Sequence, residues 1–305
     1  LTVMTDNPTP LIRQGWLRAV VFILVFFAGA VAVGTIAILM MPAADDKTTR
    51  LINQDFVVII LSALLAIFLS GAFRKFVDRR SVTSMGFTWE RYQHHAALGF
   101  LLGIALLGVG TLILYFTGNL QWNHVQFHAG DLFISLVLMM LVALGEEMVF
   151  RGYVLRNLMH SMNKWAALVI TALLFSLAHL GNPGITAPAV INLFLGGLLL
   201  GINYIYTRNL WFAILFHISW NYFQGAVLGY PISGVPLQSV LEPELKGPTW
   251  LTGGVFGFEG SLIATFVLIP TLLLLFWVYN RDDHGPSGHD HRVTGSNAPQ
   301  GHSDR

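Results

Sequence analysis

Residues 131–151 read DLFISLVLMMLVALGEEMVFR, and this stretch decides the fold class of the chain. It is apolar over most of its length, and about 20 apolar residues in a helix cross a hydrocarbon core of roughly 30 Å. Two adjacent carboxylates, Glu146 and Glu147, stand near its end. A charged side chain in hydrocarbon costs on the order of a few kcal/mol unless it is paired or neutralised, so these acids are the first candidates for a functional role.

The same apolar pattern recurs along the chain. The eight stretches are residues 17–41, 56–73, 96–116, 131–150, 165–180, 188–206, 210–228 and 259–280. The composition agrees, because 54% of the residues are hydrophobic and 11% are charged, against roughly 25% charged in an ordinary soluble domain. The sequence therefore excludes a soluble globular enzyme and predicts an all-α polytopic membrane protein with about eight transmembrane helices. The first stretch is too long for the apolar core of a signal peptide, so we interpret it as an anchor helix.

The basic residues indicate how the helices are oriented. With the N-terminus in the cytoplasm, 14 of the 17 Lys and Arg residues lie in cytoplasmic segments, and only Lys47, Arg50 and Lys246 lie outside. Cytoplasmic loops of membrane proteins carry such an excess of basic residues. We therefore expect both termini to be cytoplasmic, which requires an even number of spans, and we expect an integral, multi-pass protein of the plasma membrane.

The chain divides into five predicted segments. These are three N-terminal membrane helices in 1–130, a core of four helices in 131–228, an external loop in 229–258, a last helix in 259–280 and a cytoplasmic tail in 281–305. The tail is polar, and its composition is typical of disorder. It carries four histidines, His284, His289, His291 and His302.

Charge and cysteine content exclude several kinds of partner and cofactor. The 17 Lys and Arg residues nearly balance the 16 Asp and Glu residues, so the chain is no nucleic-acid binder. Without cysteine it has no thiolate nucleophile and no cysteine-type metal site. We expect the lipid bilayer to be a partner of the chain; the sequence indicates no oligomeric state.

The two adjacent glutamates differ in their surroundings on a helix. Glu147 and Arg151 are four residues apart and share one face, where the cation holds the carboxylate ionised. Glu146 points about 100° away and has no local partner. The pattern is typical of one structural acid and one acid that is free to titrate. The alternative is that both glutamates mark the water interface at the end of a span.

Two histidine motifs follow on other helices. Phe175 and His179 close the fifth stretch, and His217 and Asn221 share one face of the seventh. In a helical hairpin that turns near residues 161–164, Glu146 and His179 both lie about 24 Å from the turn. These polar residues therefore invite one shared site. The alternatives are a hydrogen-bonded packing histidine at 179 and a helix–helix hydrogen-bonding pair at 217 and 221.

The three motifs together resemble those of the CPBP family, also called the CAAX prenyl protease or abortive-infection family. Its pattern is Glu-Glu-x-x-x-Arg, then Phe-x-x-x-His, then His-x-x-x-Asn or Asp, on separate membrane helices, and residues 131–228 carry all three motifs in order. The resemblance implies a metal-independent intramembrane glutamic endopeptidase of the type II CAAX kind, whose best-known eukaryotic substrate is a prenylated C-terminal motif. Some family members are implicated in bacteriocin immunity or as scaffolds, so a non-catalytic membrane scaffold or immunity protein is the alternative.

The resemblance also implies roles for the site residues. Glu146 is the expected catalytic base, with His179 assisting it in activating a water, and His217 and Asn221 are donors suited to the developing oxyanion. The supporting residues are Glu147, Arg151 and Phe175. No cofactor is expected, but Glu146, His179 and His217 are also ligand types that zinc accepts, so a zinc site is the alternative.

A hydrolase in a bilayer must admit water to its site. We therefore expect a cavity among the fourth, fifth and seventh helices that opens to the cytoplasm. Gly196, Gly197 and Gly201 allow a close helix approach, so we expect the sixth helix to pack against this group without lining an open channel.

Overall fold

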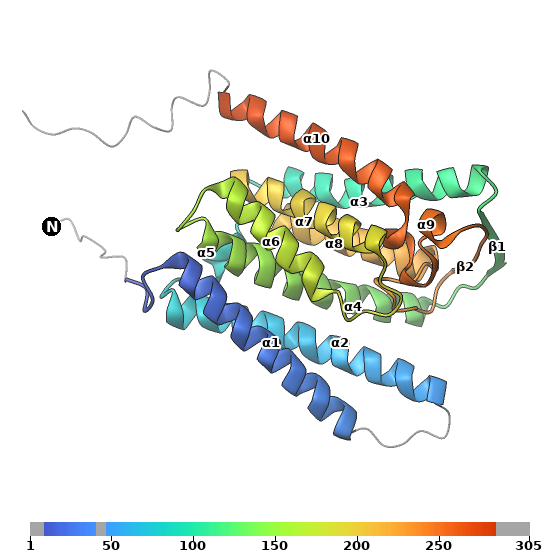
Figure 1. The fold of residues 1–305 in the computed structure, drawn as a ribbon, viewed down its shortest axis with the longest axis horizontal. Helices are drawn as coiled ribbons and strands as arrows, with labels where there is room; N and C mark the ends of the chain where they lie inside the picture. Colours follow the sequence, from blue (N-terminus) through green and yellow to red (C-terminus); the bar gives the residue numbers. More distant parts are fainter. Residues whose placement is uncertain (1–8, 41–46, 285–305) are drawn as a thin grey trace, which may run out of the picture.

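The computed structural model describes residues 9–40 and 47–284, which form a bundle of helices with a small sheet at one end (Figure 1). Among these residues, six helices are long and apolar enough to cross a membrane. They are Gly15–Met40, Phe56–Val77, Gln93–Phe116, Ala129–Leu158, Ala187–Thr207 and Leu262–Arg281. The prediction of a multi-pass helical membrane protein is therefore confirmed.

The regular elements follow one another as predicted in outline. The long helices are α1 (Gly15–Met40), α2 (Lys47–Ala72), α3 (Gln93–Phe116), α4 (Ala129–Glu147), α6 (Lys164–Ala178), α7 (Ala187–Thr207), α8 (Trp211–Tyr222) and α10 (Leu262–His284). The short helices are α5 (Arg156–Leu158) and α9 (Thr249–Thr252), and the strands are β1 (Leu120–Val125) and β2 (Leu241–Leu245). The π-helical segments are η1 (Phe73–Val77), η3 (Met148–Leu155) and η4 (Phe223–Val227); the 3-10 turns are η2 (Val82–Met85), η5 (Gly254–Phe256) and η6 (Phe258–Gly260).

The prediction of eight full spans is not confirmed. Each of the eight apolar stretches contains a helix, but α6 has 15 residues and α8 has 12, so both fall short of a span. Pro183 follows α6 closely, and the residue before a proline avoids helical geometry, so the helix cannot extend far beyond His179. In contrast, α4 runs without interruption through η3 and α5 to Leu158.

The all-α prediction is wrong in one place, because β1 and β2 pair as an antiparallel two-stranded sheet. Leu120 lies opposite Leu245, and Val125 lies opposite Leu241. In β2, half-buried residues alternate with the exposed Glu242 and Glu244, which is the pattern of a strand with one covered face. The sheet joins the predicted external loop 229–258 to the segment that follows α3.

Glycines let the core helices approach closely. A Cβ at Gly103 of α3 would overlap the Ser219 Oγ of α8, and a Cβ at Gly197 of α7 would lie 2.9 Å from the Cα of Ala172 in α6. Gly201 similarly contacts Leu168. Small residues at such interfaces allow dense van der Waals packing, the main source of helix association in lipid. The predicted close approach of the sixth apolar stretch is thus confirmed at two of its three glycines.

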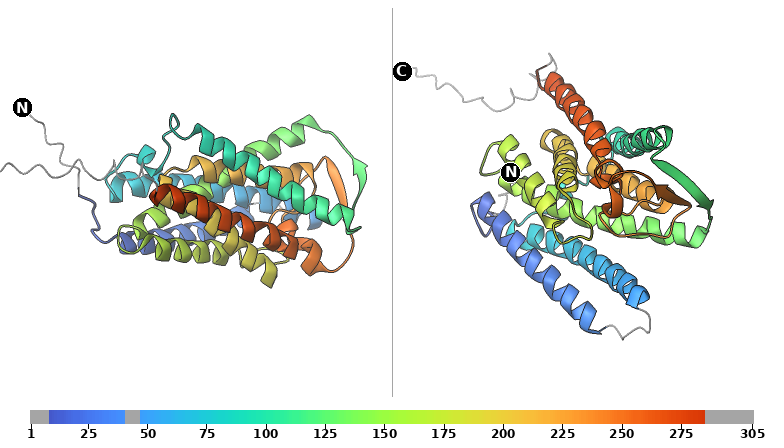
Figure 2. Two further views of the ribbon diagram at one scale, coloured as in Figure 1. Left: turned by 90° about the horizontal axis from the view of Figure 1, so that it is seen from above. Right: turned by 45° about the vertical axis from the view of Figure 1, so that its right-hand side comes forward.

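Helices α1 and α2 form a hairpin that packs on α4 and η3 as an outer layer, shown in blue in Figure 2. The hairpin is fastened at one end by a buried ion cluster. Asp78 accepts hydrogen bonds from Arg18 Nη1 at 3.0 Å and Arg74 Nη1 at 2.7 Å, and from Tyr153 and Asn157. The charges are fully enclosed, so each depends on its partners.

Two ends of the bundle can now be distinguished. The Ser161 end holds the turn between α5 and α6, where Ser161 Oγ accepts from the backbone N–H of Trp16 in α1. Phe276 of α10 contacts Trp165 there, so the start of α1 and the end of α10 lie at the same end. The sheet end holds β1 and β2. Residues 281–284 of the predicted tail continue α10, and the rest of that tail, with its other three histidines, lies outside the described residues.

Candidate active site

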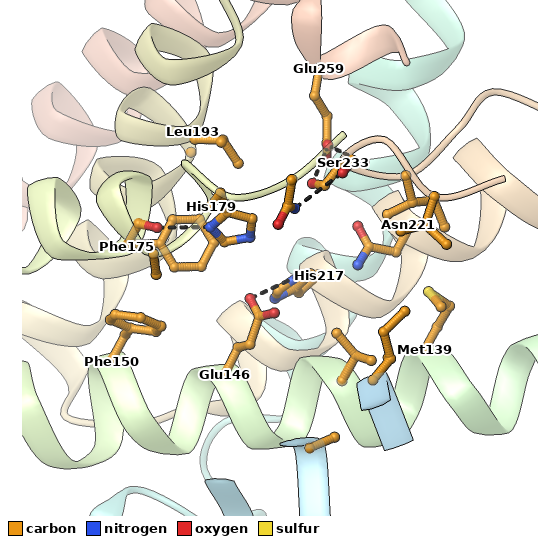
Figure 3. A pocket seen from close by; sticks show the side chains of 18 of the residues that line it. Met139, Glu146, Phe150, Phe175, His179, Leu193, His217, Asn221, Ser233 and Glu259 are labelled. Carbon is orange, nitrogen blue, oxygen red and sulfur yellow. Dashed lines mark hydrogen bonds and ion pairs between the residues drawn. The ribbon is translucent and has the colours of Figure 1, made fainter. Parts of the chain in front are cut away.

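A cavity of about 400 Å³ lies inside the bundle, and its size is ordinary for a ligand site. Its walls come from α1, α2, α4, η3, α6, α7, α8, η6 and α10, and from the segment 232–237. The four predicted catalytic residues and the predicted Phe175 all line it: Glu146, Phe175, His179, His217 and Asn221 (Figure 3). Residues separated by up to 75 positions in the sequence are thus brought together as the motifs suggested.

Glu147 is the structural acid of the pair. Its side chain is fully buried, and Oε1 accepts from Arg151 Nη1 at 2.9 Å, one helical turn away. The same oxygen accepts from His217 Nδ1 at 3.0 Å. The sequence predicted the first contact and missed the second, which connects α4 to α8 at the centre of the site.

Glu146 is the acid that faces the cavity. Its side chain is 29% exposed, and Oε2 lies 3.9 Å from His217 Nε2, which is close enough for an electrostatic interaction but too long for a hydrogen bond. That oxygen is shielded and has no hydrogen-bond partner among the described residues. A carboxylate in this state has acceptor capacity left for a ligand or a water.

His179 ends α6 with one ring nitrogen committed. Its Nδ1 lies 2.8 Å from the carbonyl oxygen of Phe175, and because a carbonyl only accepts, Nδ1–H is the donor. In a neutral ring the other nitrogen, Nε2, is then a lone-pair acceptor. Figure 3 shows the ring facing the cavity opposite Glu146. The fixed tautomer therefore presents a proton acceptor to the cavity.

Phe175 packs between the two halves of the site. Its ring centre lies 4.9 Å from that of His179 and 4.7 Å from the Cζ of Arg151. The ring thus covers the buried guanidinium on one side, in a cation–π contact, and supports the imidazole on the other. Its predicted supporting role has this geometric basis.

Asn221 lies one helical turn beyond His217 on α8, as the spacing predicted. Its residue is only 4% exposed, and its amide points into the cavity (Figure 3). The side-chain amide of Asn221 makes no hydrogen bond within the described part of the chain. Because buried amides are nearly always hydrogen-bonded, this amide is a donor group available to a ligand.

Sequence reasoning missed a second polar group in the cavity, around Glu259. This acid was predicted to lie at a span edge, but its Oε1 accepts from Trp220 Nε1 at 3.2 Å and its Oε2 accepts from Ser233 Oγ at 2.7 Å. Asn182 donates to the Ser233 carbonyl oxygen at 3.1 Å. These residues stand on four separate segments. The one available signal was that Glu259 precedes an apolar stretch without a nearby basic residue.

One prediction about the cavity is wrong. The sixth apolar stretch, α7, does line it, through Asn192, Leu193, Gly196 and Leu200. Gly196 has open space where a Cβ would be, unlike its neighbour Gly197. The cavity also extends toward the sheet end, where Ser233 and Glu259 border it, and no residue of the turn at 159–164 contributes to its lining. The opening to the cytoplasm stays a prediction. The segment 232–237, which the sequence predicted to be external, contributes to the wall of the cavity.

The residues do not gather as a metal centre. Within residues 9–40 and 47–284, no group of three His, Cys, Asp or Glu side chains is arranged to hold a metal ion. Glu146, His179 and His217 share the cavity. His217 Nδ1 is bonded to Glu147 and His179 Nδ1 to a carbonyl group, which leaves Nε2 as the second nitrogen of each ring. Such bonds orient histidines in proton-transfer sites and in zinc sites alike.

Comparison with known proteins agrees with the motifs. Residues 128–223 match the model of the Rce1-like family, whose description is type II CAAX prenyl endopeptidase Rce1-like. The match covers the segment that contains α4, α6, α7 and α8, and all of the predicted catalytic residues. The resemblance stated from the sequence is therefore confirmed. No curated protein matches the chain.

Proposed function

We infer the function from the match of residues 128–223 to the Rce1-like family model, which supports a CAAX-type intramembrane protease. We propose that it is a metal-independent endopeptidase that cleaves a membrane-associated peptide or protein. The observation that carries this proposal is the contrast between the two glutamates: Glu147 is fully buried and held by Arg151 and His217, whereas Glu146 is 29% exposed and lines the cavity.

In the proposed reaction, Glu146 takes a proton from a water molecule. The resulting hydroxide attacks the carbonyl carbon of the scissile peptide bond, and the negative charge moves to the carbonyl oxygen. When the carbon–nitrogen bond breaks, the proton passes to the leaving amine. His179 assists, because its Nε2 is an acceptor on the opposite wall and helps to orient the water.

The oxyanion is assigned mainly to Asn221. Its amide is buried, directed into the cavity and without a partner among the described residues, so it needs little reorganisation to donate. His217 differs from the sequence-based expectation, because its Nδ1–H is directed to Glu147. We assign His217 to holding α8 against α4 through its contact with Glu147.

The proposal is tested by incubating the purified protein in lipid vesicles with a panel of membrane peptides and identifying new termini by mass spectrometry. The panel includes one CAAX-type peptide with and without a prenyl group, so that lipid dependence is read directly. Cleavage is expected with and without a chelator. Glu146→Gln should abolish it, and Glu242→Gln, an exposed acid on β2, is the matched control. Cleavage that requires added zinc would support the metal alternative, and binding without any cleavage would support a scaffold.

A further inference from the structure

Two arginines at the Ser161 end of the bundle have no carboxylate partner. Arg156 begins α5, and its Nη1 donates to the hydroxyl oxygen of Tyr204 at 3.3 Å. Arg208 follows α7, and its Nη1 donates to Met159 Sδ, a weak acceptor, at 2.8 Å. Within the described residues, neither arginine forms an ion pair. Each guanidinium has five N–H donors, so most of the donors of both groups are left for a ligand.

The two guanidinium groups lie beside the same turn of helix. Arg156 and Met159 are three residues apart, so their side chains are neighbours on one helical face, and Arg208 contacts Met159. The Nε of Arg156 is shielded, yet it has no hydrogen-bond partner in the described part of the chain. The side chain of Arg208 is exposed. A ligand from outside the bundle can therefore reach the pair.

The surroundings of the arginine pair are positively charged. The buried Asp78 is the nearest carboxylate that pairs with arginines here, and it is already shared by Arg18 and Arg74. Partial burial lowers the pKa of His160, which lies just beyond α5, and three arginine charges lower this pKa further, against a smaller opposite effect of Asp78. The three are Arg18, Arg156 and Arg74. This end of the bundle therefore favours an anion.

Tryptophan side chains indicate the depth of the arginine pair in the membrane. Trp211 begins α8 three residues after Arg208, and its ring centre lies 5.0 Å from that of Trp89. Trp89 is 46% exposed, and Trp16, whose backbone N–H donates to Ser161, is 47% exposed. Tryptophan is enriched where the hydrocarbon core meets water. The arginine pair therefore lies at the level of the lipid headgroups.

We propose that Arg156 and Arg208 bind the phosphate group of an anionic lipid. Guanidinium groups bind phosphate through paired N–H···O bonds, because their planar fork of donors matches the phosphate oxygens. The basic residues predict that this end is cytoplasmic, and cytoplasmic leaflets carry anionic lipids. Neither arginine lines the cavity, so the lipid site is separate from the candidate active site and does not depend on the proposed function.

Lipid binding is measured by native mass spectrometry of the full chain, released from detergent with increasing phosphatidylglycerol or phosphatidylcholine of the same acyl chains. Both lipids carry a phosphate, but the choline group cancels its charge. We expect the first phosphatidylglycerol to bind at least about tenfold more tightly than phosphatidylcholine. Equal binding of the two lipids would overturn the proposal. Inorganic phosphate at the same concentration should not displace phosphatidylglycerol, and displacement would assign the site to a free anion.

Two double variants with the same change in charge test which residues bind. Arg156→Gln with Arg208→Gln should weaken phosphatidylglycerol binding at least about tenfold. Lys75→Gln with Arg79→Gln, exposed residues that flank Asp78 at the same end, should retain binding within about twofold. Equal losses in the two double variants would indicate a general attraction to a positive surface and would overturn the assignment, as would full binding by the arginine variant.

The single variant Arg208→Gln separates lipid binding from folding. The Arg208 side chain is exposed and its one hydrogen bond within the described residues is to a thioether sulfur. Without lipid, the variant should therefore unfold at nearly the same temperature as the unchanged protein. Phosphatidylglycerol should raise the unfolding temperature of the unchanged protein, because a ligand of the folded state stabilises it. This rise should be smaller in Arg208→Gln, and an undiminished rise would contradict the proposed role of Arg208.

Discussion

His217 Nδ1 lies 3.0 Å from Glu147 Oε1, and this contact ties the seventh apolar stretch of the chain to the fourth. The carboxylate that receives it is the same one that neutralises Arg151. Glu147 is therefore a shared acceptor in the interior of the bundle, and the adjacent Glu146 is left to face the cavity. The two neighbouring glutamates thus have different roles because the helix directs their side chains to different surroundings.

We predict opposite profiles for the two glutamine variants. Glu146→Gln should reduce peptide cleavage by at least about a hundredfold, since a general base contributes a factor of that order, and it should leave the unfolding temperature nearly unchanged. Glu147→Gln should destabilise the fold by roughly 3 to 5 kcal/mol, because Arg151 stays buried without its counter-charge. Thermal unfolding in detergent and turnover are measured on both. Equal effects in the two variants would contradict the assignment.

The Asp78 cluster should be necessary for the stability of the α1–α2 hairpin. Asp78→Asn leaves Arg18 and Arg74 buried beside each other, and we expect a loss of about 3 to 5 kcal/mol in unfolding free energy. Asp131→Asn, in the first turn of α4, is the control and should cost under about 1 kcal/mol. Denaturant titration of both variants gives the comparison, and similar losses would argue against a special role for the cluster.

Two glycines of α3 should respond to alanine with opposite signs. Gly103→Ala would place a Cβ against Ser219 Oγ and 2.9 Å from the Phe216 carbonyl oxygen, so α3 must move away from α8 and stability should fall. At Gly108 an added methyl group would have no neighbouring atom within 4 Å, so Gly108→Ala should stabilise by up to about 1 kcal/mol through the unfolded state. The unfolding temperatures of the two variants are measured in the same detergent, and a lower unfolding temperature for both variants would contradict the packing argument.

Topology remains a prediction of the basic residues. Reporter fusions after Arg80, Lys164 and Arg281 should all read cytoplasmic, and fusions within residues 231–250 should read external. In the structure, Ser161 contacts the start of α1 and Trp165 contacts α10, so the first and last helices share that side. A reporter after Lys164 on the opposite side from one after Arg281 would contradict this arrangement.

Stability should fall in strongly alkaline solution because of Tyr230. Burial raises the pKa of Tyr230 from its ordinary 10.0 to about 12. The unfolded chain then loses the Tyr230 hydroxyl proton at a lower pH than the folded chain. The contribution of Tyr230 to the free energy of unfolding is therefore fully present below pH 10 and is lost as the pH rises toward 12. Two pKa units correspond to roughly 2 to 3 kcal/mol. Tyr230→Phe should flatten the pH profile of the unfolding free energy between pH 10 and 12. An unchanged slope in this variant would contradict the role of Tyr230.

The sequence was sufficient for those parts of the site that depend on helical spacing. Glu147 with Arg151, and His217 with Asn221, are contacts or shared faces within one helix, and the period of 3.6 residues defines them. The membership of Glu146 and His179 in one cavity followed from equal distances to the Ser161 turn, and both residues line it.

The parts that could not be predicted depend on segments without a period. Ser233 and Glu259 reach the cavity because residues 232–237 fold back into the bundle, and glycines with positive φ, such as Gly229 and Gly234, allow that path. The sheet was missed because a strand of five residues, Leu241–Leu245, is a weak signal beside long apolar helices. The number of helices long enough to span the membrane was overestimated, because apolar composition alone does not show that α6 ends shortly before Pro183.

Helix α6 has a consequence for the surrounding lipid. With 15 residues it is about 22 Å long, whereas a typical hydrocarbon core measures about 30 Å. Its outward residues Val169, Leu173 and Leu177 are apolar and exposed, so acyl chains must meet this short face and compress to match it. A short apolar face of this kind favours local thinning of the bilayer, and His179 lies at the end of this helix, at the wall of the cavity. Beside α6, a peptide in the headgroup region would have less hydrocarbon to cross than beside the longer helices.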